Sequence, residues 1–436
     1  MILRTSRTKL MTSLGLSATL VAAILFAATT VRGSADPGKG GGSASSYLAP
    51  GSVGSPRFAV DPQWPLELPN NWVIGQVGGL SVDKSDNIWV LQRPSTDTVD
   101  ELYAAQTPQV AGCCFPAPPV LEFNAKGQLL QAWGPIEGAP CPSCNSTPPS
   151  SYQYVKTEHG LFATDDGYVW LTGNGTPDTQ ALKFKRDGTF VLQIGHAGQA
   201  CNNLDHVNIC KSAMFYVDTP KNEVYLSDGY GNNRVVVFNA TTGAFIRAWG
   251  AFGATASGGP YGPLLATYTT PAYTPGNPTT WFRNPVHCIT RDPNTGYIWV
   301  CDRTNDRLQV FTPAGTYVGQ CYVATSTLGA GSVWDLKFWP KKGGKNEVIL
   351  STDGTNQIVR EFLPKPDPGI GTTSGAQYCP MTGQFGHAGR NAGFFHWVHV
   401  ADIDSNGNYY EGEVDTGKRV QKFVPIGGNP GDNDHR

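Results

Sequence analysis

From about residue 58 onward, one pattern of hydrophobic and polar positions recurs along the chain. An apolar strand is followed by Asp or Asn with Gly, and then by a second strand rich in Trp, Tyr and Val. A polar turn, a third strand ending in Val-x-Phe or a similar group, a Gly-containing turn and a fourth strand complete the unit. Alternating apolar residues joined by Asn-Gly, Asp-Gly and Thr-Gly turns are typical of antiparallel strands. The pattern therefore predicts an all-β fold built from four-stranded antiparallel sheets.

Six copies of this unit follow one another. They begin with the segments GLSVDKSDNIWVLQRP, HGLFATDDGYVWLTGNG, MFYVDTPKNEVYLSDGYG, HCITRDPNTGYIWVCDRT, SVWDLKFWPKKGGKNEVILSTDG and HVADIDSNGNYYEGEVDTG. A radial array of such sheets is a β-propeller, which leaves only short, protected edges. We expect six blades between residues 57 and 427, with seven as the main alternative because the units are irregularly spaced. The segment Arg57–Val60 is expected to close the ring beside the last blade.

Three histidines occupy the same place in the second, fourth and sixth copies: His159, His287 and His399. Each comes at the start of the strand expected to lie nearest the axis. Alternate blades of a six-bladed ring lie roughly 120° apart, so these side chains are expected to converge on the axis. Three imidazoles with an open fourth position are a ligand set typical of catalytic zinc. His396, three residues before His399, is an alternative third ligand.

Composition agrees with a chain of many short strands, because 52 Gly, 33 Pro and 11% aromatic residues accompany only four Met. A net charge of -2, without runs of like charge, gives no reason to expect nucleic acid as a partner. Residues 1–35 combine a basic start, an apolar stretch and small residues, as in a cleaved export signal; a membrane anchor is the alternative. We therefore expect a secreted or periplasmic protein without a membrane partner after cleavage. Residues 36–56 are expected to form a flexible leader and residues 428–436 a disordered tail.

Ten cysteines in an exported chain favour disulfide bonds. Cys201 and Cys210 bracket one loop and are expected to pair. Cys288 and Cys301 are either a buried pair or two separate thiols of the core. The remaining cluster is expected to brace the connection between the first two blades, and it consists of Cys113, Cys114, Cys141 and Cys144.

The blade pattern resembles the NHL repeat family, and within it the lyase domain of peptidylglycine α-amidating enzymes. The resemblance is carried by EHGLFATDDGYVWLTG, YLSDGYGNNRVVVFNATTGAFIRAWG, NPVHCITRDPNTGYIWVCDRTNDRLQVF and VHVADIDSNGNYYEGEVDTGKRVQKF. It implies that the three histidines bind Zn²⁺. It also implies that Tyr230 acts as general base or acid, that Arg93 and Arg303 are active-site residues, and that one of these two arginines holds a substrate carboxylate. Asp228 and Asp302 are expected to brace turns instead of acting on substrate.

The reaction implied by the resemblance is cleavage of the C–N bond in a carboxylated α-hydroxy-amide. A peptide or small molecule ending in α-hydroxyglycine would be the substrate and glyoxylate a product. The chain departs from the family at several positions. Trp397 stands where the family has Met, which narrows the pocket; Val400 replaces the acidic residue linked to calcium, which argues against Ca²⁺; Gly231 replaces a Cys; and Pro94 follows Arg93.

Two other functions agree with the same pattern. The first is a non-catalytic propeller that binds a protein, glycan or surface partner and keeps the metal as a brace. The second is a streptogramin lyase, which requires a site of Mg²⁺ type with a carboxylate and a histidine. The sequence leaves the oligomeric state open.

Overall fold

The computed structural model describes residues 56–136, 138–140, 150–269, 271–275, 279–340, 348–366 and 378–426. The expected signal 1–35, the tail 428–436 and the leader 36–56, apart from Pro56, lie outside the described residues. Within the described ranges the chain contains 26 β-strands and short 3₁₀ turns, and no α-helix. The 3₁₀ turns are η1 (Pro69–Asn71), η2 (Pro94–Thr96), η3 (Tyr103–Ala105), η4 (Thr219–Lys221), η5 (Ala251–Gly253) and η6 (Arg303–Asn305).

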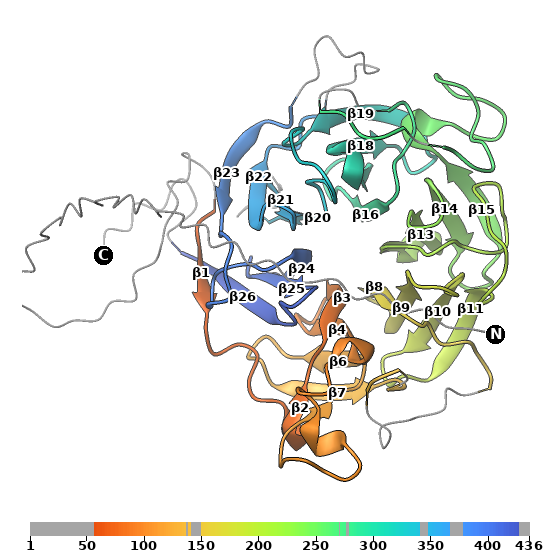
Figure 1. Ribbon diagram of the computed structural model, residues 1–436. Helices are drawn as coiled ribbons and strands as arrows, with labels where there is room; N and C mark the ends of the chain where they lie inside the picture. The colour runs from red at the N-terminus through yellow and green to blue at the C-terminus, as the bar shows by residue number, and fades with distance from the viewer. Residues whose placement is uncertain are drawn as a thin grey trace, which may run out of the picture. The chain divides into compact units, whose positions relative to one another are not determined.

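Six antiparallel sheets of four strands each form a ring around a central axis (Figure 1). The prediction of a six-bladed propeller is therefore confirmed. In blades 1 to 3 the strands run outward from the axis in chain order. Blade 1 is β3 (Gln76–Val82), β4 (Ile88–Arg93), β6 (Val120–Phe123) and β7 (Leu129–Trp133); blade 2 is β8 (Glu158–Ala163), β9 (Tyr168–Gly173), β10 (Gln180–Lys185) and β11 (Phe190–Gly195); blade 3 is β12 (Phe215–Asp218), β13 (Glu223–Asp228), β14 (Arg234–Asn239) and β15 (Phe245–Trp249).

The remaining three blades repeat this order, and a small parallel pair lies beside blade 1. Blade 4 is β16 (Val286–Arg291), β17 (Ile298–Asp302), β18 (Arg307–Phe311) and β19 (Tyr317–Tyr322); blade 5 is β20 (Asp335–Trp339), β21 (Val348–Asp353), β22 (Ile358–Phe362) and β23 (Met381–Phe385); blade 6 is β24 (Val398–Ile403), β25 (Tyr409–Glu413), β26 (Val420–Pro425) and β1 (Phe58–Asp61); the parallel pair is β2 (Trp72–Val73) with β5 (Phe115–Pro116).

The first strand of the chain closes the ring, as predicted. Strand β1 is the outermost strand of blade 6 and pairs antiparallel with β26, in a register that places Phe58 opposite Pro425. The backbone N–H of Ile426 donates to the carbonyl of Arg57 at 2.7 Å, which extends this pairing. Because the two ends of the propeller lie in one sheet, no blade is left with an open seam.

Apolar side chains fill the seams between neighbouring blades. Between blades 1 and 2, for example, Trp89 and Leu91 of β4 pack with Leu171 and Phe184 of blade 2. Full burial of a side chain of this size stabilises the fold by about 1.5–3 kcal/mol. Each sheet has two faces, and each face packs against one neighbouring blade. Apolar side chains on a strand are therefore buried in the seam on either side of its blade.

Glycine allows the inner strands to approach one another closely. A Cβ at Gly78 of β3 would lie 2.4 Å from the carbonyl oxygen of Glu158 in β8. A Cβ at Gly160 of β8 would lie 2.2 Å from the carbonyl oxygen of Ala213, just before β12. Larger residues at these positions would push blades 1, 2 and 3 apart and widen the axis.

Four disulfides lie within the described residues. Cys201–Cys210 forms as predicted, Cys288 and Cys301 are a bonded pair and not two separate thiols, and Cys321–Cys379 joins blades 4 and 5. Cys113 pairs with Cys114, while Cys141 and Cys144 lie outside the described residues. Within the part of the chain that the structure covers, no helix has the length and hydrophobicity needed to cross a membrane.

Candidate metal centre and active site

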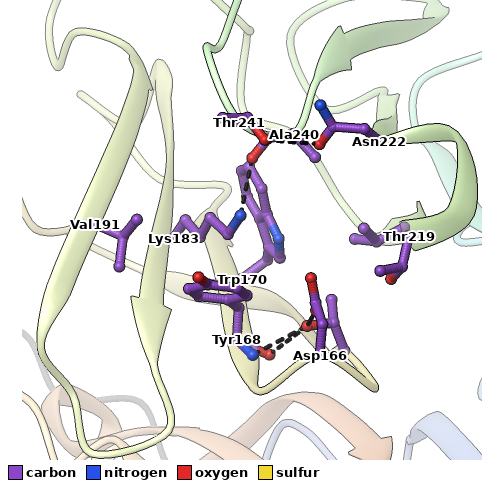
Figure 2. A pocket seen from close by; sticks show the side chains of 11 residues that line it. Asp166, Tyr168, Trp170, Lys183, Val191, Thr219, Asn222, Ala240 and Thr241 are labelled. Atoms are coloured by element: carbon purple, nitrogen blue, oxygen red, sulfur yellow. Dashed lines mark hydrogen bonds between the residues drawn. The ribbon is translucent and has the colours of Figure 1, made fainter.

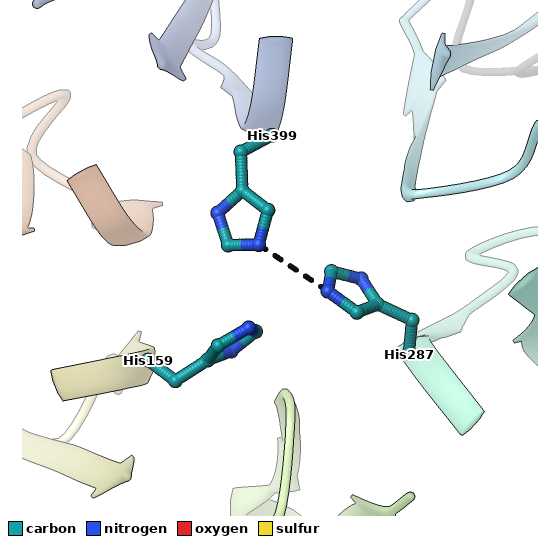
Figure 3. A group of neighbouring side chains, drawn as sticks. All are labelled: His159, His287 and His399. Carbon is teal, nitrogen blue, oxygen red and sulfur yellow. Dashed lines mark hydrogen bonds between the residues drawn. The ribbon is translucent and has the colours of Figure 1, made fainter. Parts of the chain in front are cut away.

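The three histidines meet on the propeller axis (Figure 3). Their ring centroids are 4.8–5.1 Å apart, and one ligand nitrogen from each lies within 4.8 Å of the others. All three side chains are buried. They come from the beginnings of β8, β16 and β24, and we call this end of the ring the histidine end.

Each histidine lies at an irregularity in strand pairing. The register between β8 and β9 shifts between Glu158 and Gly160, and that between β24 and β25 shifts between Val398 and Val400. The shift between β16 and β17 spans Val286 to Ile289. An extra residue in one strand bends the backbone and redirects the side chain there. The bulges therefore turn His159, His287 and His399 towards the axis (Figure 3).

The Nδ1 atom of each imidazole contacts a backbone carbonyl. His159 Nδ1 lies 3.1 Å from the oxygen of Ala213, His287 Nδ1 lies 2.5 Å from that of Trp334, and His399 Nδ1 lies 3.1 Å from that of Val77. A carbonyl oxygen can only accept, so Nδ1 carries the proton in all three rings. Each Nε2 atom is therefore left with a free lone pair, which is the arrangement of a metal-ligating histidine.

The lone pairs of these Nε2 atoms face one another. The Nε2 atoms of His287 and His399 are 3.2 Å apart (Figure 3), and both lack a proton in the neutral rings. Burial lowers the pKa of all three imidazoles well below its ordinary value, and neighbouring imidazole or guanidinium groups lower it further. A proton is thus disfavoured between them, whereas a metal ion would satisfy all three. Three imidazole nitrogens are a donor set that a divalent metal ion such as Zn²⁺ accepts, so this group could hold a metal ion.

Tyr230 lies over the histidine cluster. Its phenolic oxygen is 3.0 Å from Nε2 of His159 and 3.1 Å from Nε2 of His287. The loop after β13 that carries it lies close to β16, because a Cβ at Gly229 would lie 2.1 Å from the carbonyl oxygen of Val286. Glycine at position 229 therefore brings Tyr230 to the histidines.

The departure at Gly231 has a structural counterpart. The N–H of Gly231 donates to the carbonyl of Cys210 at 2.8 Å, and a Cβ at position 231 would lie 2.5 Å from Cys210 Sγ. Cys210 itself is bonded to Cys201. The loop of Tyr230 is thus held beside a disulfide through its backbone, although it contains no cysteine.

Arg303 completes the group around the phenol. It opens η6 directly after β17, and its Nη1 donates to the hydroxyl of Tyr230 at 3.1 Å. Its guanidinium carbon lies 4.3 Å from the ring centroid of Trp334. The Nε of Arg303 is buried and has no acceptor among the described residues. A cationic group with unused donors is therefore held beside the histidines.

Arg93 approaches the same cluster from blade 1. Its Nε donates to the carbonyl of Glu158 at 2.5 Å and its Nη1 to the side chain of Gln76 at 2.8 Å. Burial raises the pKa of the Glu158 carboxyl to about 8, although the positive charge of Arg93 opposes the shift. The Glu158 carboxyl is therefore mainly protonated near pH 7 and does not neutralise the positive charge of Arg93.

The other candidates from the sequence lie elsewhere. His396 contacts Asp415 at 3.0 Å through Nε2 and is not among the converging nitrogens. Val400 packs in the apolar core and offers no oxygen ligand. Asp228 and Asp302 bind Arg234 and Arg307 at 2.8 and 2.6 Å, so they brace loops as expected.

Two features of the site were not found from the sequence. One is Trp334, whose carbonyl holds His287 and whose ring packs on Arg303. The other is the bulge at each histidine. An aromatic residue before an inner strand and one extra residue in a strand have no distinctive sequence signal.

A separate cavity of about 210 Å³ lies between blades 2 and 3, at the far ends of β8 and β9 from His159 (Figure 2). Lys183 reaches into it, donates to the carbonyl of Ala240 at 2.9 Å and lies 4.0 Å above the ring centroid of Tyr168. In blade 6, Lys422 donates to the carbonyl of Ala125 of blade 1 in the same way, at 2.9 Å. Lys183 is thus a repeated inter-blade contact, and this cavity contains none of the predicted site residues.

Two groups of curated proteins are similar to the chain in sequence. NHL repeat-containing protein 3 of Mus musculus is 26% identical over 325 residues, which cover 71% of this chain and 73% of that protein. Peptidyl-glycine alpha-amidating monooxygenase A of Xenopus laevis is 26% identical over 273 residues, which cover 60% of this chain. The matched region spans only 24% of the Xenopus protein. No protein-family model matches the chain.

Among solved structures, a streptogramin B lyase aligns with a TM-score of 0.44 and 11% identity, over 84% of this chain and 98% of that one. No functional conclusion follows from a likeness at that level. The similarity to a repeat-containing protein agrees with the six repeated four-stranded sheets of the ring. The chain is therefore a six-bladed propeller that is similar in sequence to NHL repeat-containing protein 3 and to peptidyl-glycine alpha-amidating monooxygenases.

Proposed function

We propose that this protein is a zinc-dependent lyase that cleaves the C–N bond of a carboxylated α-hydroxy-amide and releases glyoxylate. The observation that carries the proposal is the set of three unprotonated Nε2 atoms on the axis. The hydroxyl of Tyr230 contacts two of them, and Arg303 donates to that hydroxyl. Similarity to peptidyl-glycine alpha-amidating monooxygenases supports a substrate that ends in a glycine-derived group. No carboxylate belongs to the converging ligand group of the described residues, which does not favour a streptogramin-lyase type of site.

The proposed reaction needs one proton to move and one bond to break. The three histidines would hold a zinc ion, which would supply Lewis acidity that lowers the pKa of a hydroxyl on the substrate. Tyr230, positioned between two imidazoles and Arg303, would act as a phenolate: it accepts the hydroxyl proton, passes it to the amide nitrogen and ends the cycle as a phenolate again. The C–N bond breaks as the carbonyl of glyoxylate forms, so atoms and charge balance without an oxidant or reductant.

The guanidinium groups supply the binding of the substrate's carboxylate. Arg303 has an unused Nε, and Arg93 lies on the opposite side of the cluster in blade 1. Charge-assisted hydrogen bonds from guanidinium to carboxylate are strong and directional. We assign the carboxylate to Arg303 first, because Arg93 already donates to Glu158 and Gln76.

We also propose that the protein is secreted or periplasmic. Its disulfides support this, because such bonds persist in oxidising compartments.

Metal analysis tests the first half of the proposal. Purified protein, dialysed against Zn²⁺ and then against buffer, should retain about one zinc ion per chain by inductively coupled plasma mass spectrometry. His159→Ala, His287→Ala and His399→Ala should each lose it, because each removes one of three ligands. His396→Ala is the matched control and should keep its zinc. Wild-type protein that retains no metal would contradict the proposal.

Turnover of α-hydroxyhippurate tests the second half. Zinc-loaded protein should release glyoxylate and benzamide. Tyr230→Phe should keep the zinc and lose about 10²–10⁴-fold in rate, as expected when a general acid–base group is removed. Zinc without glyoxylate would leave the alternative in place, in which the propeller binds a protein, glycan or surface partner and the metal acts only as a brace.

A further inference from the structure

Trp397 has an unusual backbone conformation directly beside the metal centre. It lies two residues before His399 with φ of 54°, in the left-handed region. A bulky side chain is uncommon there, and the surrounding structure must hold it in place. The N–H of Trp397 donates to the Gln357 side chain at 2.7 Å, and its carbonyl accepts from the N–H of Val414 at 3.1 Å. Both contacts fix a conformation that a smaller residue would adopt at lower cost.

The indole of Trp397 continues an aromatic surface that begins at the histidines. The Trp334 ring centroid lies 5.8 Å from that of His399 and 6.0 Å from that of His287. The Trp397 ring lies 5.3 Å from Trp334, at an interplanar angle of 54°. Arg303 packs on the ring of Trp334, and that residue is 5% exposed, whereas Trp397 is partly exposed. Trp397 is therefore the accessible part of the aromatic surface.

We propose that Trp397 is a specificity-determining residue that selects substrates with an aromatic acyl group on the glycine nitrogen. This inference rests on the proposed function, because it places the substrate carboxylate at Arg303 and the hydroxyl at the histidines. Both of those groups border Trp334, so the acyl group extends along the surface that leads to Trp397. A flat aromatic acyl group gains stacking against the indole, and a small aliphatic acyl group does not.

Binding of two unreactive analogues tests this inference without turnover. Hippurate and N-acetylglycine carry the same glycine carboxylate, lack the hydroxyl, and differ only in the acyl group. Isothermal titration calorimetry should give a Kd for hippurate that is on the order of tenfold lower than the Kd for N-acetylglycine. This difference is expected in both the zinc-loaded and the metal-free protein. Trp397→Leu should remove this difference and leave the Kd of N-acetylglycine unchanged, whereas Trp397→Phe should keep part of it. Tyr378→Leu, at an exposed aromatic residue just before β23, is the control and should behave as wild type.

The outcomes separate this inference from the proposed lyase activity. Equal Kd values for the two analogues in the wild-type protein, or no binding of hippurate, would overturn the role of Trp397. Preference for hippurate without release of glyoxylate from α-hydroxyhippurate would support the aromatic specificity and contradict the lyase. Release of glyoxylate with no preference for hippurate would support the lyase and contradict the aromatic specificity.

Discussion

The residue at the bulge of an inner strand decides whether a side chain reaches the axis. In blades 2, 4 and 6 this residue is His159, His287 and His399. Blade 1 has the same irregularity, between Val77 and Gly79, but the residue there is Gly78. That bulge therefore directs no side chain to the axis, and β3 instead approaches β8 closely. The same bulge thus places a candidate metal ligand on the axis in three blades and allows close packing in a fourth.

Asp97 is a buried acid for which a pH effect is expected. Both of its carboxylate oxygens are buried without a hydrogen-bond partner among the described residues. Burial raises its pKa to about 7 from an ordinary value of 3.8, although Lys418 opposes the shift. The folded protein therefore keeps this proton at pH values where the unfolded chain has lost it. The free energy of unfolding consequently falls as the pH rises from about 4 to about 7.

Asp97→Asn should remove this dependence. Three pKa units correspond to at most about 4 kcal/mol, so the melting temperature of the variant at pH 8 should exceed that of the wild type by several degrees. At pH 4 the two should be equal, because both side chains are then neutral. Thermal unfolding followed by circular dichroism between pH 4 and pH 8 measures this. Asp165→Asn, at an exposed turn, is the control. A parallel pH dependence in wild type and Asp97→Asn would show that the carboxyl is charged in the folded state.

At the scale of elements, the outer strands of blades 4 and 5 are joined more firmly than the blade pattern alone suggests. Cys321 in β19 is bonded to Cys379, which comes just before β23, and the N–H of Cys379 donates to the carbonyl of Tyr322 at 2.9 Å. The chain just before β23 therefore contacts β19 of blade 4, and only then enters β23, the outermost strand of blade 5. Covalent closure of this loop limits how far the two blades can separate.

Loss of the Cys321–Cys379 bond should lower the free energy of unfolding and leave the proposed zinc binding in place. The bond closes a loop with a sequence separation of 58, against 13 for Cys288–Cys301. Loop-closure entropy gives about 4 kcal/mol for the longer loop and about 3 kcal/mol for the shorter. Cys321→Ala combined with Cys379→Ala should thus lower the midpoint of urea unfolding, while its zinc content stays at the wild-type level. An unchanged midpoint would indicate that the seam between the blades is held by packing alone.

For the whole molecule, the ring depends on a strand from the beginning of the propeller. Phe58 of β1 packs against Trp339, Phe385 and Tyr409, so that strand also covers the seam between blades 5 and 6. Removal of β1 would expose both this apolar surface and the edge of β26. An exposed edge strand is a site of intermolecular pairing.

Two truncated chains test this dependence. A chain that starts at residue 56 should melt at the same temperature as one that starts at residue 36. A chain that starts at residue 62 lacks β1, so it should melt at a lower temperature and form larger species in size-exclusion chromatography. Equal melting temperatures for the chains that start at residues 56 and 62 would show that blade 6 is stable with three strands.

The sequence predicted the parts of this molecule that repeat. Six copies of one strand pattern give the blades, and the equal placement of three histidines gives their meeting on the axis. Trp334 and Asp97 could not be predicted in the same way, since their environments are created by residues far apart in the chain. Cys321 and Cys379 lie in different blades, and no spacing rule pairs them. Local periodicity therefore reveals the architecture, whereas contacts between blades depend on the closed ring.

The carbonyls that orient the three imidazoles have a consequence for the metal centre. The histidines come from blades 2, 4 and 6, and the oxygens come from Ala213 at blade 3, Trp334 at blade 5 and Val77 in blade 1. All six blades thus contribute to the group of three converging imidazoles. Opening of any of the seams crossed by these contacts would turn an imidazole away from the axis, so affinity for the ion and cohesion of the ring are thermodynamically linked. A bound metal ion would therefore stabilise the closed ring, and substitutions in blades that do not contact the substrate would change the affinity for the ion.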